Sequence, residues 1–144
     1  MSGVEVREAR DDDERAQAMA IRQAVFVQEQ DVPSELELDG RDDEAVHLVA
    51  VRDGAVVATC RLLVHGATVH LGRLAVDASA RRQGIAQHLL RAAEAWARAH
   101  GARRLGLSAQ TYAAALYAAA GYQPVGEPFM EAGIEHVDME RDLG

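Results

Sequence analysis

Six consecutive residues near the middle of the chain have the types and spacing of a phosphate-binding turn. They are Arg81-Arg82-Gln83-Gly84-Ile85-Ala86. The small residues at the fourth and sixth positions allow backbone N–H groups to approach an anion closely, and a helix that begins here adds its positive end. The two arginines can neutralise phosphate oxygens as well. A capped turn without a ligand explains these six residues equally well on their own.

The residues around this turn exclude two other phosphate ligands. A nucleoside triphosphate site needs a Lys-Ser or Lys-Thr pair after its second glycine, and the chain has no lysine. A dinucleotide site needs three spaced glycines early in a parallel unit, which the sequence lacks.

The formal net charge of -8 also argues against a nucleic-acid partner, because phosphate backbones are held by dense basic patches. An acidic surface suits a small cationic or amine substrate better.

A strand before the turn and a helix after it would hold the turn in place, and the sequence predicts both. Val69–Val76 is expected to be a strand. After Asp77 the apolar residues recur at helical spacing as far as Gly101, a helix stop. The residues of this apolar face are Ala86, Leu89, Leu90, Ala93 and Ala97.

Other patterns complete the domain. A helix is expected from Glu14 to about Val27, after the capping residues Asp11-Asp12-Asp13, and Gln28–Glu44 is expected to be an acidic loop with one helical turn. The remaining elements are a hairpin of Val46–Arg52 and Ala55–Leu63, a helix from Thr111 to Ala120, and strands at Val4–Arg7, Leu105–Leu107, Gln123–Gly126 and His136–Glu140. Together they predict an α+β fold with a mixed sheet and helices.

Length and composition predict one globular domain spanning residues 1–144. The hydrophobic fraction is 49%, and no stretch approaches the roughly 18 uninterrupted apolar residues of a membrane span. The first residues, from Met1 to Val6, lack the basic-then-apolar order of a secretory signal, so a cytoplasmic location is expected. The single cysteine, Cys60, lies on an apolar strand and is expected to pack rather than to react.

The turn and two further segments resemble the GCN5-related N-acetyltransferases, the GNAT family. The family signature is Gln or Arg, two residues, Gly, one residue, then Gly or Ala, and Arg81, Gly84 and Ala86 fill it. Leu74-Ala75-Val76 resembles the family's fourth strand, whose backbone contacts the pantetheine arm and the thioester carbonyl. The segment Gln110-Thr111-Tyr112-Ala113, followed by Leu116-Tyr117 and Gly121-Tyr122, is similar to the family's closing segment, with Gln110 where Asn is commoner.

Further motifs extend the resemblance over nearly the whole chain, to the ElaA/YjcF-like branch of the family. They are Val25-Phe26-Val27-Gln28-Glu29-Gln30-Asp31-Val32-Pro33, Asp39, His47, Ala109-Gln110 and Ala132-Gly133-Ile134-Glu135-His136. The resemblance implies a mostly antiparallel twisted sheet flanked by helices. It also implies a site for acetyl-CoA formed by Leu74, Ala75, Val76, Arg81, Arg82, Gln83, Gly84, Ile85, Ala86, Gln110 and Tyr117.

The function expected from this resemblance is direct transfer of an acetyl group from acetyl-CoA to a primary amine. The alternative is a domain that binds acyl-CoA as a sensor without turnover. The amine belongs to a small molecule or to a protein N-terminus, and no metal is expected. A homodimer is an open possibility, with the second hairpin strand or the C-terminal strand at its interface.

The transfer needs an acid for the departing thiolate and a base for the amine. By resemblance Tyr117 is the acid, although packing with Leu116 and Ala120 is an alternative. His70 stands where some family members carry a catalytic glutamate, and a neutral imidazole can accept a proton, but a structural role on its strand is also open.

The acidic loop and its neighbours supply the remaining candidates. Glu29 and His47 compete with His70 as the base, and Phe26, Gln30, His47 and Arg61 are expected to contact the acceptor. Glu37 and Asp39 lie in the loop near Arg61 and Arg73, and a carboxylate beside an arginine has a lowered pKa and is a poor base. These acids are therefore expected to order the loop or bind a cationic acceptor, with a solvated acidic surface as the alternative.

Overall fold

One sheet runs through the whole molecule. The computed structural model describes residues 3–144, and Met1 and Ser2 of the N-terminal segment considered above lie outside this range. The described residues form a seven-stranded sheet in the order β1-β2-β3-β4-β5-β7-β6. The strands are β1 (Glu5–Glu8), β2 (Val46–Arg52), β3 (Ala55–His65), β4 (Thr68–Val76), β5 (Arg104–Gln110), β6 (Gln123–Glu131) and β7 (Ile134–Asp142).

Every neighbouring pair of strands is antiparallel except β4 and β5, which are parallel. The predicted α+β fold with a mixed, mostly antiparallel sheet is therefore confirmed. The hairpin of β2 and β3 has its turn at Asp53-Gly54, as predicted. β3 and β7, the strands named above for a possible dimer interface, each have a neighbouring strand on both sides. In the described chain the free edges of the sheet belong to β1 and β6.

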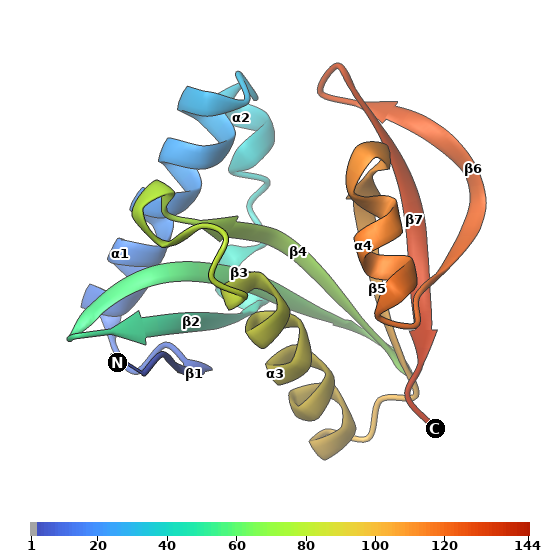
Figure 1. Cartoon of the computed structure of the whole chain (residues 1–144), viewed down its shortest axis with the longest axis horizontal. Helices are drawn as coiled ribbons and strands as arrows, with labels where there is room; N and C mark the ends of the chain where they lie inside the picture. Colours follow the sequence, from blue (N-terminus) through green and yellow to red (C-terminus); the bar gives the residue numbers. More distant parts are fainter. Residues whose placement is uncertain (1–2) are drawn as a thin grey trace.

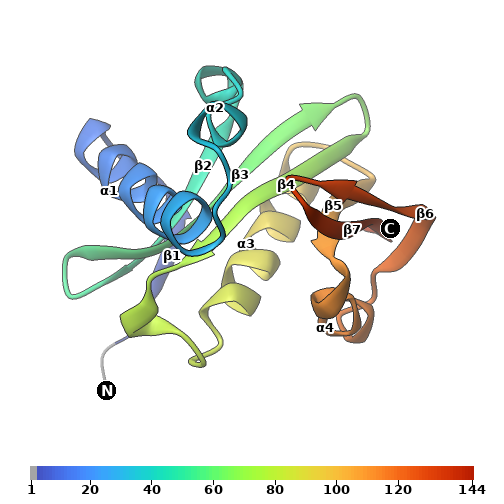
Figure 2. The same cartoon turned by 90° about the horizontal axis from the view of Figure 1, so that it is seen from above.

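Helices cover both faces of the sheet (Figures 1 and 2). α1 (Asp12–Arg22) and α2 (Ser34–Glu37) lie on one face, and α3 (Ile85–Ala99) and α4 (Ala114–Ala119) lie on the other. α1 continues into a π-helix, η1 (Gln23–Glu29). Three short 3₁₀ turns are η2 (Asp42–Glu44), η3 (Ala78–Ala80) and η4 (Thr111–Ala113). None of the helices in residues 3–144 is long and apolar enough to cross a membrane.

α1 begins where the sequence predicts a cap. The Asp11 carboxylate accepts a hydrogen bond of 2.9 Å from the backbone N–H of Glu14, and acids fill the first turn, where the helix dipole favours them. The predicted helix of Glu14 to Val27 is present, but it changes to π-helical geometry at Gln23. The predicted helix at Thr111 likewise starts as a 3₁₀ turn and becomes α-helical at Ala114.

Two apolar layers hold these helices against the sheet. α3 buries Leu89, Leu90, Ala93 and Ala97 of the predicted face against one side of the sheet, whereas Ala86 is only partly buried. α1 and η1 bury Ala18, Ile21 and Val25 against Val49, Val56 and Ala75 on the other side. The neighbours Leu48 and Val49 enter opposite layers because successive strand residues point to opposite faces. Cys60 packs in the α3 layer, and burial raises the pKa of its thiol to about 12, so it stays protonated.

Candidate functional site

The parallel strands β4 and β5 pair only at their beginnings. Their pairing runs from Thr68 opposite Arg104 to Leu71 opposite Leu107 and then ends. Beyond this point β4 pairs with β3 alone and β5 with β7 alone, and the two halves of the sheet diverge (Figure 1). The inner edge of each strand thus offers backbone donors and acceptors to an extended ligand, as an open sheet edge does.

A bulge shapes the inner edge of β4. The register between β3 and β4 shifts between Thr59 and Arg61, and Arg73 adopts a left-handed backbone conformation with φ of 53°. This conformation is unfavourable for a residue with a Cβ atom, and it bends the strand where it leaves β5. Leu74, the next residue, lines cavities on both sides of the opening.

The predicted phosphate-binding turn lies between the end of β4 and the start of α3. Arg82 and Gly84 have φ of 62° and 76°, and Gly84 is the N-cap of α3. The first N–H groups of a helix have no acceptor within the helix, so those of α3 are free for an anion. A Cβ atom on Gly84 would meet nothing within 4 Å, so the space beside this backbone is open. The turn therefore fits a pyrophosphate group.

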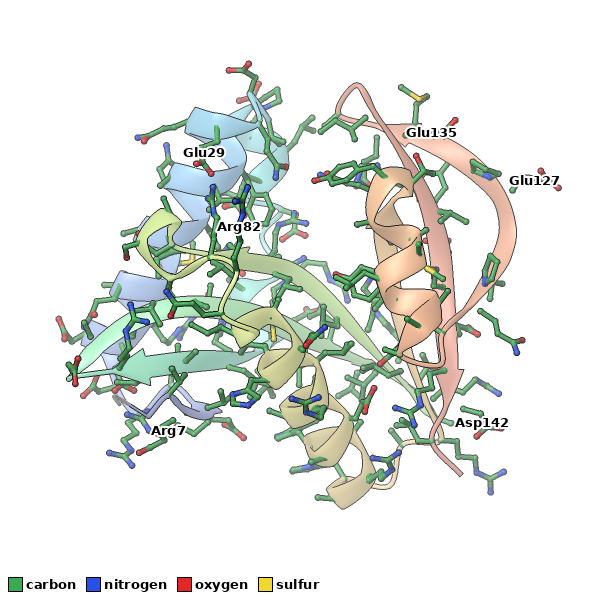
Figure 3. The ribbon with its side chains drawn as sticks, viewed as in Figure 1. Arg7, Glu29, Arg82, Glu127, Glu135 and Asp142 are labelled. Carbon is green, nitrogen blue, oxygen red and sulfur yellow. The ribbon has the colours of Figure 1, made fainter. Side chains whose placement is uncertain are left out.

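Arg81 and Glu29 form an ion pair beside this turn. Arg81 also donates from Nε to the backbone carbonyl of Val76 at 3.1 Å. Glu29 is at the end of η1, and Figure 3 shows it above the turn that carries Arg82. Both partners are more than two-fifths exposed, so the pair contributes little to stability. Glu29 does not line the cavity described next.

A cavity of about 380 Å³ opens where β4 and β5 separate. It contains the predicted residues Phe26, Gln30, His70, Leu74, Gln110 and Tyr117 in its lining. The amide nitrogen of Gln110 donates to the amide oxygen of Gln30 at 3.1 Å, so these two walls of the cavity are joined. The structure thus brings the candidate acid, one candidate base and two candidate acceptor residues to one place.

Tyr117 lies on α4 between this cavity and a second one. The second cavity, of about 520 Å³, runs between α3 and α4 and shares Leu74 and Tyr117 with the first. The Tyr117 ring packs edge-on against Tyr122, with centroids 6.2 Å apart. Burial raises the pKa of the Tyr117 hydroxyl, so it carries its proton at neutral pH. The side chain therefore packs against Tyr122 and also lines both cavities.

His70 lies on β4 opposite Gly106 of β5. A Cβ atom on Gly106 would lie 3.7 Å from Nδ1 of His70, so the glycine leaves room for the imidazole ring. Burial lowers the pKa of His70, which favours the neutral ring, and the nearby charge of Asp138 opposes this shift. Asp138 accepts a hydrogen bond of 2.6 Å from Ser108, another residue of the cavity wall. The neutral form of His70, which can accept a proton, is therefore favoured.

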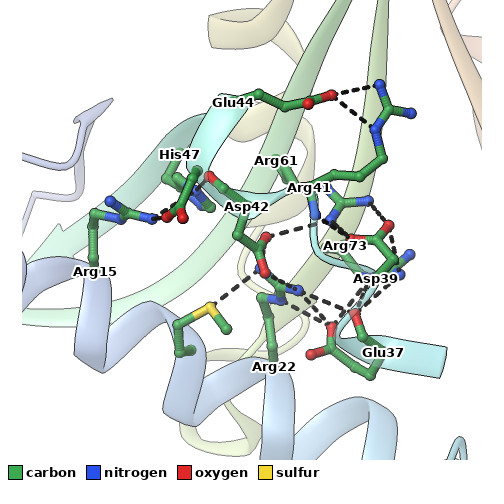
Figure 4. A network of polar contacts seen from close by, with 12 residues as sticks. Arg15, Arg22, Glu37, Asp39, Arg41, Asp42, Glu44, His47, Arg61 and Arg73 are labelled. Atoms are coloured by element: carbon green, nitrogen blue, oxygen red, sulfur yellow. Dashed lines mark hydrogen bonds and ion pairs between the residues drawn. The ribbon is translucent and has the colours of Figure 1, made fainter. Parts of the chain in front are cut away.

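Six charged residues form an ionic cluster beside the cavity, and two of them, Glu37 and Arg73, line it (Figure 4). They are Arg22, Glu37, Asp39, Asp42, Arg61 and Arg73. Arg22 and Glu37 are almost fully buried, and their side chains meet at 2.8 Å. Both terminal nitrogens of Arg61 donate to Asp39 at 2.8 Å, and this contact holds the pKa of Asp39 well below its usual range. The acids thus order the predicted acidic loop against β3 and β4. Glu37 is buried and Asp42 is partly buried, whereas Asp39 is exposed and paired with Arg61.

Two residues predicted to contact the acceptor lie outside the cavity. Arg61 is 5% exposed, because its guanidinium is bound by Asp39 and Asp42. His47 is 8% exposed, and its Nε2 lies 2.8 Å from the backbone carbonyl oxygen of Asp42. Both side chains therefore support the acidic loop in this structure and do not face an acceptor in the cavity.

Part of the cavity wall was absent from the sequence-based candidates. Gly72, Arg73, Ser108 and Tyr112 line it from the strands and from η4, and Glu131, Ala132, Ile134 and His136 line it from the hairpin of β6 and β7. The segment Ala132 to His136 was recognised as a branch marker, and this was the available signal for the hairpin. In residues 3–144 no group of three or more His, Cys, Asp or Glu side chains is arranged to hold a metal ion.

Comparisons with known proteins agree with this geometry. Residues 10–143 match the family described as "Acetyltransferase (GNAT) domain". The uncharacterized N-acetyltransferase YjcF of Bacillus subtilis is 33% identical over 135 residues, which cover 93% of this chain and 96% of that protein. A solved acyl-CoA N-acyltransferase from Pseudomonas aeruginosa is 33% identical with a TM-score of 0.85, covering 98% of this chain and 99% of that one. Escherichia coli ElaA is 26% identical with a TM-score of 0.84, covering 99% and 100%.

Proposed function

The chain belongs to the GNAT acetyltransferase family, and from this premise we propose that it transfers an acetyl group from acetyl-CoA directly to a primary amine. The observation that carries the proposal is the opening between β4 and β5. A turn whose backbone suits an anion lies at the end of β4, and a cavity lined by Tyr117 and His70 lies beside the same strand.

The donor would lie along β4. The N–H groups at the start of α3, with Arg81 and Arg82, would hold the pyrophosphate of coenzyme A. The inner edge of Leu74–Val76 would pair with the amides of the pantetheine arm, because this edge no longer pairs with β5. Gln110 faces it from β5. The thioester would then lie at Leu74 and Tyr117, where the two cavities meet.

The reaction would proceed in this cavity without a covalent enzyme intermediate. The amine nitrogen attacks the thioester carbonyl carbon, the C–N bond forms and the C–S bond breaks. His70 would take the proton that the amine loses, and Tyr117 would give a proton to the departing thiolate. Backbone N–H groups of β4 would stabilise the oxyanion that forms in between. The amine releases one proton to His70 and the thiolate takes up one from Tyr117, so the products are an N-acetyl amine and coenzyme A.

The experiment is a panel of primary amines and peptide N-termini, assayed for release of free thiol from acetyl-CoA. With a competent acceptor, we expect Tyr117→Phe to lower kcat by roughly 100-fold or more while the Kd for coenzyme A stays nearly constant. Unchanged kcat would remove Tyr117 from the mechanism. Tight binding of acetyl-CoA without turnover of any amine would instead favour the acyl-CoA sensor.

A further inference from the structure

Arg73 is the cation in the wall of the acceptor cavity, and the ionic cluster holds only part of its guanidinium. Nε and Nη2 donate to the backbone carbonyl of Glu37 at 3.2 and 3.1 Å, and Nη2 also donates to that of Leu36. The same two nitrogens approach the carboxylates of Glu37 and Asp39 at 3.1 and 3.4 Å. The third nitrogen, Nη1, has no hydrogen-bond partner in the described part of the chain. One side of the guanidinium is thus fixed, and the N–H groups of Nη1 are unused.

Nη1 of Arg73 keeps some solvent exposure. The Arg73 side chain is 23% exposed and lines the cavity. Within residues 3–144, the one side-chain nitrogen or oxygen that is buried without a partner is Nε of Arg61, so Nη1 of Arg73 is not sealed inside the protein. The pKa of Arg73 is lowered, first by burial and then by the neighbouring charge of Arg61. The cluster therefore leaves this cation only partly compensated.

A guanidinium has N–H donors and no acceptor, so it selects an acceptor-only group such as an anionic oxygen. Arg73 directly precedes Leu74, where the thioester would lie. An anion held by Arg73 would therefore place a nearby amine of the same molecule beside the reacting carbonyl. Arg22, Arg61 and Arg73 face the three carboxylates of the cluster, so the charges within the cluster balance. Of the carboxylates in the cavity wall, Glu37 is held by Arg22 and Arg73, and Glu131 lies on β6.

We propose that Nη1 of Arg73 binds an anionic group of the acceptor, and that the acceptors are small primary amines which also carry a carboxylate or a phosphate. This inference rests on the proposed function for the reacting site and names its substrate class. The backbone conformation of Arg73 fixes the side chain for this contact, because the bulge and the cluster together determine where the guanidinium lies.

The test compares matched acceptors with acetyl-CoA as donor. One set is leucine, leucinamide and 3-methylbutylamine, and a second pair is O-phosphoethanolamine and ethanolamine. We expect kcat/KM to fall roughly 10- to 100-fold when the anion is removed, the range for a hydrogen bond to a charged group. A loss of kcat/KM within the leucine set indicates a carboxylate site, and a loss within the ethanolamine pair indicates a phosphate site. Equal rates within both sets would overturn the proposal.

Variants assign the preference to Arg73. In Arg73→Met the anionic and neutral acceptors should be used at nearly equal rates, whereas Arg73→Lys should keep part of the preference. Arg41→Met is the matched control, because Arg41 lies in the same loop, pairs with the exposed Glu44 and does not line the cavity. It should keep the full preference. A preference that survives in Arg73→Met would also overturn the proposal.

A binding experiment separates this inference from the proposed function. Binding of N-acetylleucine and N-acetylleucinamide is measured by calorimetry on the wild-type protein with coenzyme A present. We expect the carboxylate to bind roughly 10- to 100-fold more tightly than the amide even if no amine is turned over. Absence of turnover with this preference intact would refute the enzyme and keep the anion site. Equal affinities would refute the anion site whatever the turnover.

Discussion

The buried ion pair of Glu37 with Arg22 gives the sharpest prediction on stability. Glu37→Gln keeps the shape of the side chain and removes its charge. Glu37 is 3% exposed, and its Oε2 is approached by Nη2 of Arg22 at 2.8 Å and by Nε of Arg73 at 3.1 Å. Removing one partner of a buried pair costs about 3 to 5 kcal/mol, because the other charge remains buried. Asp42 still compensates Arg22 at 2.7 Å, so we expect the lower end, about 3 kcal/mol.

This loss should be clear in both chemical and thermal unfolding. For a chain of 144 residues each kcal/mol corresponds to about 3 °C in Tm, so Tm should fall by about 10 °C. The free energy of unfolding is measured by urea titration with circular dichroism at pH 7. Glu44→Gln is the control, because its pair with Arg41 is exposed and should contribute less than about 1 kcal/mol. A loss below about 1 kcal/mol for Glu37→Gln would refute the reasoning that this cluster holds the loop.

Three further predictions concern pH and the phosphate-binding turn. Because burial lowers the pKa of His70, kcat/KM should decline only as the pH falls below about 6.5, where the imidazole gains its proton, and His70→Gln should remove this acid limb from the pH profile. Arg61 depresses the pKa of Asp39, so the contribution of Asp39 to stability is present above about pH 4 and is lost at lower pH. Urea titrations from pH 7 to 2 should give Asp39→Asn a lower free energy of unfolding that depends less on pH than that of the wild type. A free energy that falls with pH in parallel with the wild type would contradict this. Gly84→Ala places a Cβ atom at φ of 76°, which should cost about 1 kcal/mol of stability and weaken coenzyme A binding in calorimetry, and an unchanged Kd would show that this backbone is not part of the donor site.

The elements that depend on local patterns were predictable from the sequence. The alternation of apolar residues around Asp53-Gly54 predicts the β2–β3 hairpin, and the spacing of Leu89, Leu90, Ala93 and Ala97 predicts the buried face of α3. The order of the strands was not predictable in the same way. The position of β7 between β5 and β6 depends on pairs such as Gln110 with His136, which are distant in the sequence and have no local signature.

The candidate site was likewise predictable only where it depends on a local pattern. The phosphate-binding turn is contiguous, so its residue types and spacing were visible in the sequence. The partners of the arginines were not, because a sequence does not say which of many acids an arginine will meet. Arg61 could equally face a ligand or a carboxylate, and the structure gives it Asp39 and Asp42. Arg73, at the bulge in β4, meets Glu37 and Asp39 instead, and these acids hold only part of its guanidinium.

The π-helix η1 makes the number of residues in this segment matter as much as their identity. Each residue of an α-helix turns the chain by about 100°, and each residue of a π-helix, with its i→i+5 hydrogen bonds, turns it by less. The side chains that follow Gln23, among them Phe26 and Gln30 of the cavity wall, therefore point in directions that a continuous α-helix would not give them. A homologous chain that is one residue shorter between Gln23 and Glu29 can close this segment as an α-helix, so the positions that line its cavity depend on helix geometry as well as on aligned residue letters.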